Sequence, residues 1–90
     1  MRTKIAFIGA GSVVFAKTLI SDILQFPELN DCCISLMDID AARLRVAEVM
    51  TQKIISKLGV KAVCEATTDR REAIRGAKYV ICAIDRKSVV

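Results

Sequence analysis

The residues with the clearest chemical potential are two glycines near the N-terminus. Gly9 and Gly11 belong to the stretch Gly-Ala-Gly-Ser-Val-Val, which follows the apolar run at residues 4–8. In dinucleotide-binding turns of the G-x-G-x-x-G type, the first glycine permits a tight turn and the second lets a pyrophosphate approach the backbone. The third glycine, which lets helix and strand pack closely, is replaced by Val14. The turn therefore keeps the two glycines that serve the phosphates, and the N–H groups around Ser12 and Val13 are expected to supply the donors.

An acidic residue further along the chain completes the pattern. Asp38 follows the apolar run at residues 34–37, and a carboxylate at the end of a second strand can accept hydrogen bonds from ribose hydroxyls. It would repel a 2′-phosphate, which favours NAD over NADP, although Arg43 could weaken that discrimination. Asp40 competes for the ribose, but its position favours the N-cap of a helix. For Ser12, a phosphate contact and a helix cap remain equally open.

These residues must be positioned by alternating strands and helices. Apolar runs predict four strands, at residues 4–8, 34–37, 62–66 and 79–84. Apolar residues at three-to-four spacing predict a helix from Val13 to before Pro27, and a longer one between Asp40 and Gly59. Thr67-Thr68-Asp69 followed by Glu72 resembles a capping box and predicts a third, short helix that ends near Gly76.

This alternation predicts an α/β fold, namely a truncated Rossmann-like parallel sheet of about four strands with helices on both faces. By analogy with doubly wound folds, the strand order is 3-2-1-4, and the ligand crevice lies at the carboxyl end of the first strand, beside the fourth. Gly9 lies there. Residues 1–84 are therefore interpreted as the N-terminal part of a dinucleotide-binding domain.

Composition restricts the partners. The chain has 90 residues, 53% of them hydrophobic and 27% charged, which is typical of at most one folded domain. No apolar run approaches the roughly 18–20 residues that cross a bilayer, so we predict no membrane association and a cytoplasmic protein. The net charge is +4, but the basic residues are scattered, so we predict no nucleic-acid partner. The four cysteines lack zinc-site spacing and a histidine partner, and we expect buried free thiols.

The string KIAFIGAGSVVFAKTLISDILQFPEL, followed by ISLMDIDAARL, closely resembles the start of glycoside hydrolase family 4. In that family GAGS is the usual phosphate turn, the third glycine is normally absent, and the first aspartate of MDID, here Asp38, belongs to the NAD site. LMDID is similar to the α-galactosidase and α-glucosidase branch rather than to the 6-phospho-glycosidases. The resemblance therefore implies an unphosphorylated α-glycoside as the substrate of a full-length parent.

The resemblance also implies an unusual mechanism, since this family depends on NAD instead of a carboxylate pair. In the family's mechanism, NAD⁺ takes a hydride from C3 of the sugar, and a divalent metal, usually manganese, stabilises the enolate. The aglycone then leaves by elimination, water adds, and NADH returns the hydride. The family's metal ligands and its acid and base residues lie downstream of this segment, and the chain has no histidine. We therefore predict no catalytic or metal-binding residue here, an inactive fragment, and a parent that forms a homo-oligomer.

The predicted cofactor-binding residues are Gly9, Ala10, Gly11, Ser12, Val13, Asp38 and Ala83. Residues 85–90, DRKSVV, resemble the translation of a sequencing adapter, so we interpret them as a non-native tail. Two alternatives remain, a dehydrogenase of the lactate/malate type and a stand-alone nucleotide-binding module. A Cys-His metal pair downstream would support the glycosidase, and an Arg-His substrate site would support the dehydrogenase.

Overall fold

Four strands and three helices alternate along the chain in a computed structural model that describes residues 3–10 and 13–82, with the backbone alone for residues 13–15. The strands are β1 (Lys4–Ile8), β2 (Cys33–Met37), β3 (Val63–Thr67) and β4 (Tyr79–Cys82). The helices are α1 (Val13–Leu24), α2 (Ala41–Leu58) and α3 (Arg70–Ile74). All strand pairs are parallel, in the order β3-β2-β1-β4. The predicted fold class and strand order are confirmed.

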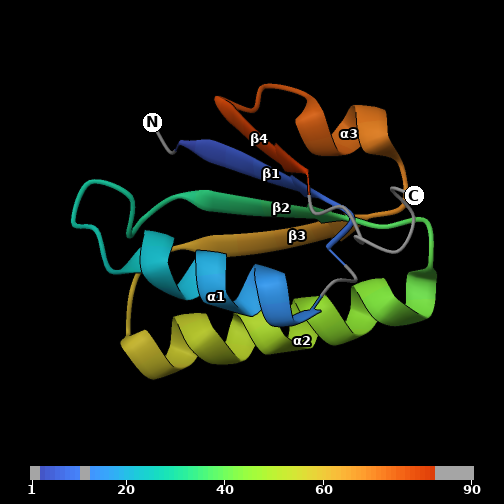
Figure 1. The fold of residues 1–90 in the computed structure, drawn as a ribbon. Helices are drawn as coiled ribbons and strands as arrows, with labels where there is room; N and C mark the ends of the chain where they lie inside the picture. Colours follow the sequence, from blue (N-terminus) through green and yellow to red (C-terminus); the bar gives the residue numbers. More distant parts are fainter. Residues whose placement is uncertain (1–2, 11–12, 83–90) are drawn as a thin grey trace.

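The helices divide between the two faces of the sheet, as Figure 1 shows: α1 and α2 lie side by side on one face and α3 lies on the other. This arrangement follows from the crossovers, because right-handed connections that reverse direction along the sheet place their helices on opposite faces. The chain moves from β1 outward to β3 through α1 and α2, and then returns past β1 to β4 through α3.

The core lies between the sheet and the helices α1 and α2. Strand side chains that point to this face are fully buried: Ile5, Phe7, Ile34 and Leu36. They meet the inner face of α1 and α2, which contributes Ala16, Ile20, Leu24, Leu44 and Ala47. Alternate strand residues point to the face of α3, where the short helix covers less of the sheet and Val63 and Val80 stay exposed. One face therefore carries most of the hydrophobic stabilisation.

Two predicted boundaries shift, and a third is not tested. Pairing with β2 sets β3 at Val63–Thr67, one residue later than predicted, because the buried Ala62 is apolar without belonging to the ladder. The helix α3 ends at Ile74 because Gly76 takes a left-handed conformation, with a φ of 73°. The predicted end of the fourth strand at residue 84, together with the tail at 85–90, lies outside the described residues.

Lys4 ties three elements together, a role that the sequence did not reveal. Its ammonium donates to the backbone oxygens of Arg75 (2.7 Å) and Glu72 (3.2 Å) and lies 3.2 Å from the Glu65 carboxylate. The side chain of Lys4 is 19% exposed. It therefore fastens the C-terminal end of α3 to both β1 and β3.

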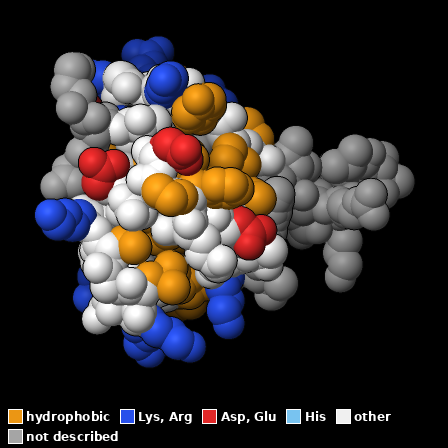
Figure 2. Space-filling model, turned by 90° about the vertical axis from the view of Figure 1, so that its left-hand side faces the viewer, with side chains coloured by type: hydrophobic (Ala, Val, Ile, Leu, Met, Phe, Trp, Pro, Cys, Tyr) orange, Lys and Arg blue, Asp and Glu red, His pale blue; other side chains and the backbone are white. Residues whose placement is uncertain are grey.

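Figure 2 shows the end of the molecule where the loop between α1 and β2 projects, with apolar side chains gathered in the middle and basic ones at the margins. Phe26, in this loop, is 55% exposed.

In the described part of the chain, no helix combines the length and the apolar character needed to span a bilayer.

Candidate functional site

A cleft of about 640 Å³ opens at the carboxyl ends of the strands. Its described lining comes from the end of β1, the end of β2 and the segment after β3: Ile8, Gly9, Met37, Asp38, Ile39, Thr68, Asp69 and Arg70. Parallel strands finish at the same edge, so residues distant in sequence meet there. This wall is on the β2 side of β1, whereas Ala83, which was predicted to line the β4 side, lies outside the described residues.

Gly9 forms the turn that leaves β1. Its φ of 82° is left-handed, a conformation that glycine adopts without steric cost. The N–H groups of Gly9 and Ala10 both donate to the Met37 oxygen, at 2.8 and 2.9 Å. The turn is thus pinned to the end of β2, and these two amides already have an acceptor. Phosphate donors from this turn must then come from residues that follow Ala10.

Of the other residues predicted for this turn, Ala10 and Val13 belong to the described part of the chain. The Ala10 side chain is fully buried in the core, and Ala10 is not among the described residues that line the cleft. Val13 is the first residue of α1, so its backbone N–H lies at the positive end of a helix of 12 residues whose first turn holds no acid. Gly11 and Ser12 lie outside the described residues.

Asp38 lies on the cleft wall, as predicted. Its Oδ1 accepts a hydrogen bond from the Asp40 N–H at 2.8 Å, which orients the carboxylate. A carboxylate offers about four acceptor positions, so bonds to ribose hydroxyls are compatible with this contact.

Asp40 caps α2, and this prediction is confirmed. Its Oδ1 accepts from the N–H groups of Ala42 (3.0 Å) and Arg43 (3.2 Å), and its backbone is extended. The Arg43 guanidinium lies 3.8 Å from Asp40 and is not among the described cleft residues. The two aspartates of MDID therefore have separate roles, and Arg43 is directed to the cap.

Sequence reasoning missed the wall that follows β3. Asp69 is the N-cap of α3 and accepts from the Arg71 N–H at 2.9 Å, as the capping pattern suggested. The reciprocal half of the box differs: the Asp69 N–H donates to Thr67 Oγ1 (3.0 Å), while Glu72 pairs with Arg75 (3.0 Å). The signal available in the sequence was position, because a segment directly after a third parallel strand must reach the same edge as Gly9.

Ile39 also lines this cleft, between the two aspartates. Its side chain is 87% exposed, more than any other large hydrophobic residue in the described part of the chain. An apolar side chain held in solvent at the rim of a polar cleft provides a surface for a flat apolar group. The cleft therefore combines apolar surface, two carboxylates and the guanidinium of Arg70.

Comparison with known proteins decides the family. The model of the family described as "Family 4 glycosyl hydrolase" matches residues 4–86, which is most of the chain. The chain belongs to glycosyl hydrolase family 4. This membership confirms the resemblance inferred from the GAGS and MDID stretches.

Curated family 4 relatives are much longer than this chain. It is 41% identical over 81 residues to an alpha-galactosidase of Rhizobium meliloti (strain 1021), covering 90% of this chain and 16% of the relative. It is 40% identical over 85 residues to an alpha-glucosidase of Erwinia rhapontici, covering 94% and 19%. An alpha-galactosidase of Bacillus subtilis (strain 168) is 38% identical over 81 residues, covering 90% and 19%. The chain thus spans less than a fifth of the length of these relatives.

The thiols and carboxylates form no evident metal centre in the described part of this family 4 chain, where no group of three or more His, Cys, Asp and Glu is placed to hold an ion. All four cysteines lie in the described part of the chain, and none of them forms a disulfide. Cys32 is fully buried, but Cys33 and Cys64 are partly buried and Cys82 is exposed. The expectation of buried thiols is therefore wrong for Cys82, whose strand β4 has neighbours on one side only in the described sheet.

Proposed function

We propose that this chain is the NAD-binding N-terminal portion of a family 4 glycosidase, and that the fragment by itself is catalytically inactive. The observation that carries the proposal is the meeting of Gly9 and Asp38 on one cleft wall at the carboxyl ends of β1 and β2. A glycine in a left-handed turn and an acid at a strand end, both at this edge, are the two features that dinucleotide sites of parallel sheets require.

The residues of the cleft fit the adenosine half of NAD. Asp38 would accept hydrogen bonds from the ribose hydroxyls, and Ile39 would pack against the adenine ring. The pyrophosphate would lie near the Gly9 turn and the start of α1, where the helix dipole favours negative charge. When bound in the full-length parent, NAD would supply reversible hydride transfer with the sugar, which is the redox chemistry of this family.

The charges of the cleft support NAD over NADP. Asp38 and Asp69 contribute two carboxylates and Arg70 one guanidinium among the described lining residues. A 2′-phosphate next to Asp38 would place like charges together, whereas a free 2′-hydroxyl can donate to the carboxylate. Arg43 does not change this balance, because it is drawn to the Asp40 cap.

The proposed parent cleaves O-glycosyl bonds of α-glycosides by redox-assisted elimination. Support comes from the family membership and from relatives named alpha-galactosidase and alpha-glucosidase. The parent would also need a divalent metal, whose ligands would come from outside this chain, with manganese as the ion expected from the family. We further propose a cytoplasmic homo-oligomer. Family membership supports a glycosidase parent over a dehydrogenase of the lactate/malate type.

Replacement of Asp38 by Asn tests the nucleotide site. The asparagine oxygen can still accept from the Asp40 N–H, so the turn is kept while the negative charge is lost. Since hydrogen bonds to charged groups are worth about 1.5–3 kcal/mol, NAD affinity should fall roughly tenfold to a hundredfold. The preference for NAD over NADP should shrink as well. Titration calorimetry of the 90-residue chain with each nucleotide measures both effects.

Asp22→Asn provides the matched control, since Asp22 is exposed on α1 and is not among the cleft residues. This variant should bind NAD as the unchanged chain does. A folded, unchanged chain that shows no saturable heat with NAD or NADP would contradict the proposal. Measurable glycosidase activity of the 90 residues alone would contradict the predicted inactivity.

A further inference from the structure

Helix α2 carries more apolar surface than the sheet and α1 cover. Its inner face buries Leu44, Ala47 and Thr51 against the sheet. Next to this face, Met50 and Ile54 are partly buried and pack against the core, whereas Val46, Val49 and Leu58 are exposed. A surface helix normally presents polar residues to solvent, so these exposed apolar side chains indicate a second packing partner.

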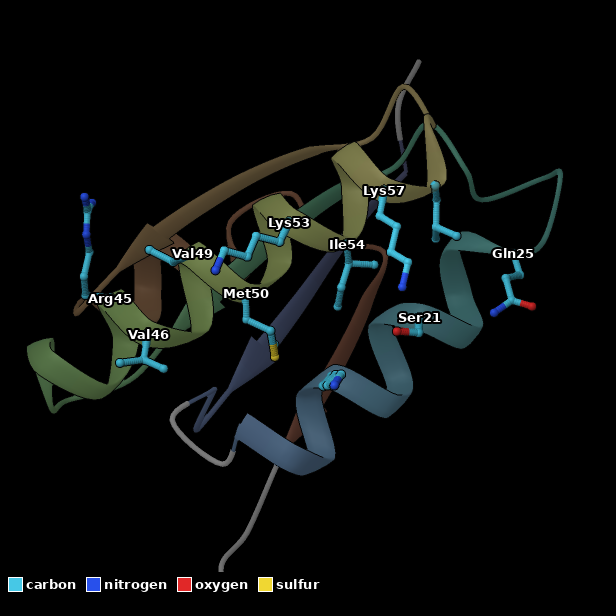
Figure 3. A pocket seen from close by; sticks show the side chains of 11 residues that line it. Ser21, Gln25, Arg45, Val46, Val49, Met50, Lys53, Ile54 and Lys57 are labelled. Carbon is cyan, nitrogen blue, oxygen red and sulfur yellow. The ribbon is translucent and has the colours of Figure 1, made fainter.

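These five side chains form one wall of a groove of about 680 Å³ between α2 and α1. Figure 3 shows Met50 and Ile54 of α2 directed toward α1, from which Ser21 and Gln25 come. Met50 and Ile54 are partly buried, whereas Val46 is 56% and Val49 40% exposed. The groove therefore has an apolar floor and an open apolar rim along α2.

The charged residues of this groove are all cations: Lys17, Arg45, Lys53 and Lys57. Arg45 is paired with Glu48 at 3.3 Å. Among the residues that the structure describes, none of the three lysines makes an ion pair, although Lys57 also suits the negative end of the α2 dipole. The groove thus favours an occupant that is apolar along its middle and acidic along its edges.

We propose that the groove receives an amphipathic helix from the remaining part of the parent polypeptide, with Asp or Glu flanking its apolar stripe. The source follows from length, because the aligned relatives extend over more than five times the region shared with this chain. A helix on the same polypeptide has a high effective concentration, so a shallow groove suffices. The proposal of a docked helix depends on the proposed function in one respect, namely that the parent polypeptide is longer than this chain.

Two other occupants fit less well. A second copy that presented the same face would bring its own Lys17, Lys53 and Lys57 against these cations, which is electrostatically unfavourable. A bilayer surface is broad and flat, whereas the groove is a channel between two helices, with the geometry of helix-in-groove recognition.

Two synthetic helical peptides test the recognition chemistry on the 90-residue chain. Both carry Leu at positions i, i+3, i+4 and i+7, and they differ in having Glu or Lys beside this stripe. The Glu peptide should bind the chain with chemical-shift changes confined to α1 and α2, and about fivefold to tenfold more tightly than the Lys peptide, given the worth of exposed ion pairs. Equal affinity for the two peptides, or no binding of either, overturns the charge argument.

Charge reversal separates recognition from loss of folding. The double variant Lys53→Glu/Lys57→Glu should prefer the Lys peptide, a gain that a misfolded chain cannot produce. Val46→Ser/Val49→Ser should weaken binding of the Glu peptide, whereas Val80→Ser, on β4 and 51% exposed, should not. Asp38→Asn should leave peptide binding unchanged, because the groove and the NAD cleft share no lining residue. Failure of the NAD proposal is thereby distinguished from failure of this one.

The source of the helix is tested on the product of the complete reading frame. A mixture of unlabelled and nitrogen-15-labelled protein is treated with a carbodiimide. Lys53 or Lys57 should then be joined to carboxylates of the same molecule, so that each cross-linked pair of peptides carries one labelling only. Cross-links between differently labelled chains would identify a second copy as the occupant and overturn the proposal. The proposal would also be overturned if Lys53 and Lys57 formed neither kind of cross-link. Binding of the groove to anionic phosphatidylserine vesicles instead would overturn it too.

Discussion

At the residue scale, two aspartates of one short stretch differ in their contacts because Asp38 follows a strand and Asp40 precedes a helix. Asp38 ends a strand, so its carboxylate lies at the edge where β1 and β2 both finish. Asp40 precedes α2 and accepts from two N–H groups of the first helical turn. The Asp40 N–H donates back to Asp38, so the helix cap also orients the acid of the cleft. A change at Asp40 therefore acts on the cleft through Asp38.

Cys64 provides a prediction at the same scale. Burial, followed by the nearby charges of Glu48, Cys33 and Glu65, raises the pKa of the Cys64 thiol from 9.0 to about 12. Since the thiolate is the reactive form, iodoacetamide at pH 8.5 should alkylate Cys64 on the order of a hundredfold more slowly in the folded chain than in urea. Peptide mapping by mass spectrometry measures the rate, with the exposed Cys82 as the internal reference.

The same pKa shift predicts a direction for stability. The folded state holds the Cys64 proton more tightly than the unfolded state does, so this contribution is complete below pH 9 and is lost as the pH rises toward 12. The difference in unfolding free energy between the unchanged chain and Cys64→Ala should thus diminish across this range. A difference that grows with pH, or equal alkylation rates in buffer and urea, would contradict the assigned environment.

At the element scale, local chemistry defines α2 at both ends. Asp40 supplies the N-cap, and Gly59 ends the helix in a left-handed conformation with a φ of 66°. The Gly59 N–H donates to the oxygens of Ile55 (3.0 Å) and Ser56 (3.2 Å). Both signals are readable in the sequence, which explains why the limits of this helix were predicted well.

Gly59→Ala tests the C-terminal cap. A Cβ at this position would meet nothing within 4 Å, so the cost arises only from the left-handed backbone. We expect the free energy of unfolding to fall by about 1–2 kcal/mol, measured by urea denaturation followed by circular dichroism. Gly59→Asn should lose less, because Asn tolerates this conformation. An alanine variant as stable as the unchanged chain would show that the helix end relaxes to a right-handed conformation.

At the scale of the whole molecule, Lys4 joins segments that lie at opposite ends of the described chain. Its ammonium contacts oxygens of α3 and of the residue after it, as well as Glu65 of β3. Lys4→Met keeps the length and the apolar stem of the side chain but leaves these acceptors without their donor.

We expect Lys4→Met to lower the free energy of unfolding by about 1.5–3 kcal/mol, since hydrogen bonds to charged groups have this worth. Urea denaturation measures the loss, and hydrogen exchange should rise first in α3, which Lys4 fastens to the sheet. Lys17→Met, an exposed position on α1, serves as the control and should change stability by less than about 0.5 kcal/mol. Equal effects of the two changes would assign Lys4 no special part in the fold.

The strand order was predicted by analogy with doubly wound folds, whereas the sequence by itself determined the order and type of the elements, the Asp40 cap and the presence of Asp38 at a strand end. These follow from local periodicity, caps and the handedness of crossovers, all of which neighbouring residues impose. Only the tertiary structure decided that Arg70 and Asp69 share the cleft with Gly9, that Lys4 holds α3, and that α1 and α2 enclose a basic groove. Those features depend on contacts between residues far apart in the chain, and no local pattern carries that information.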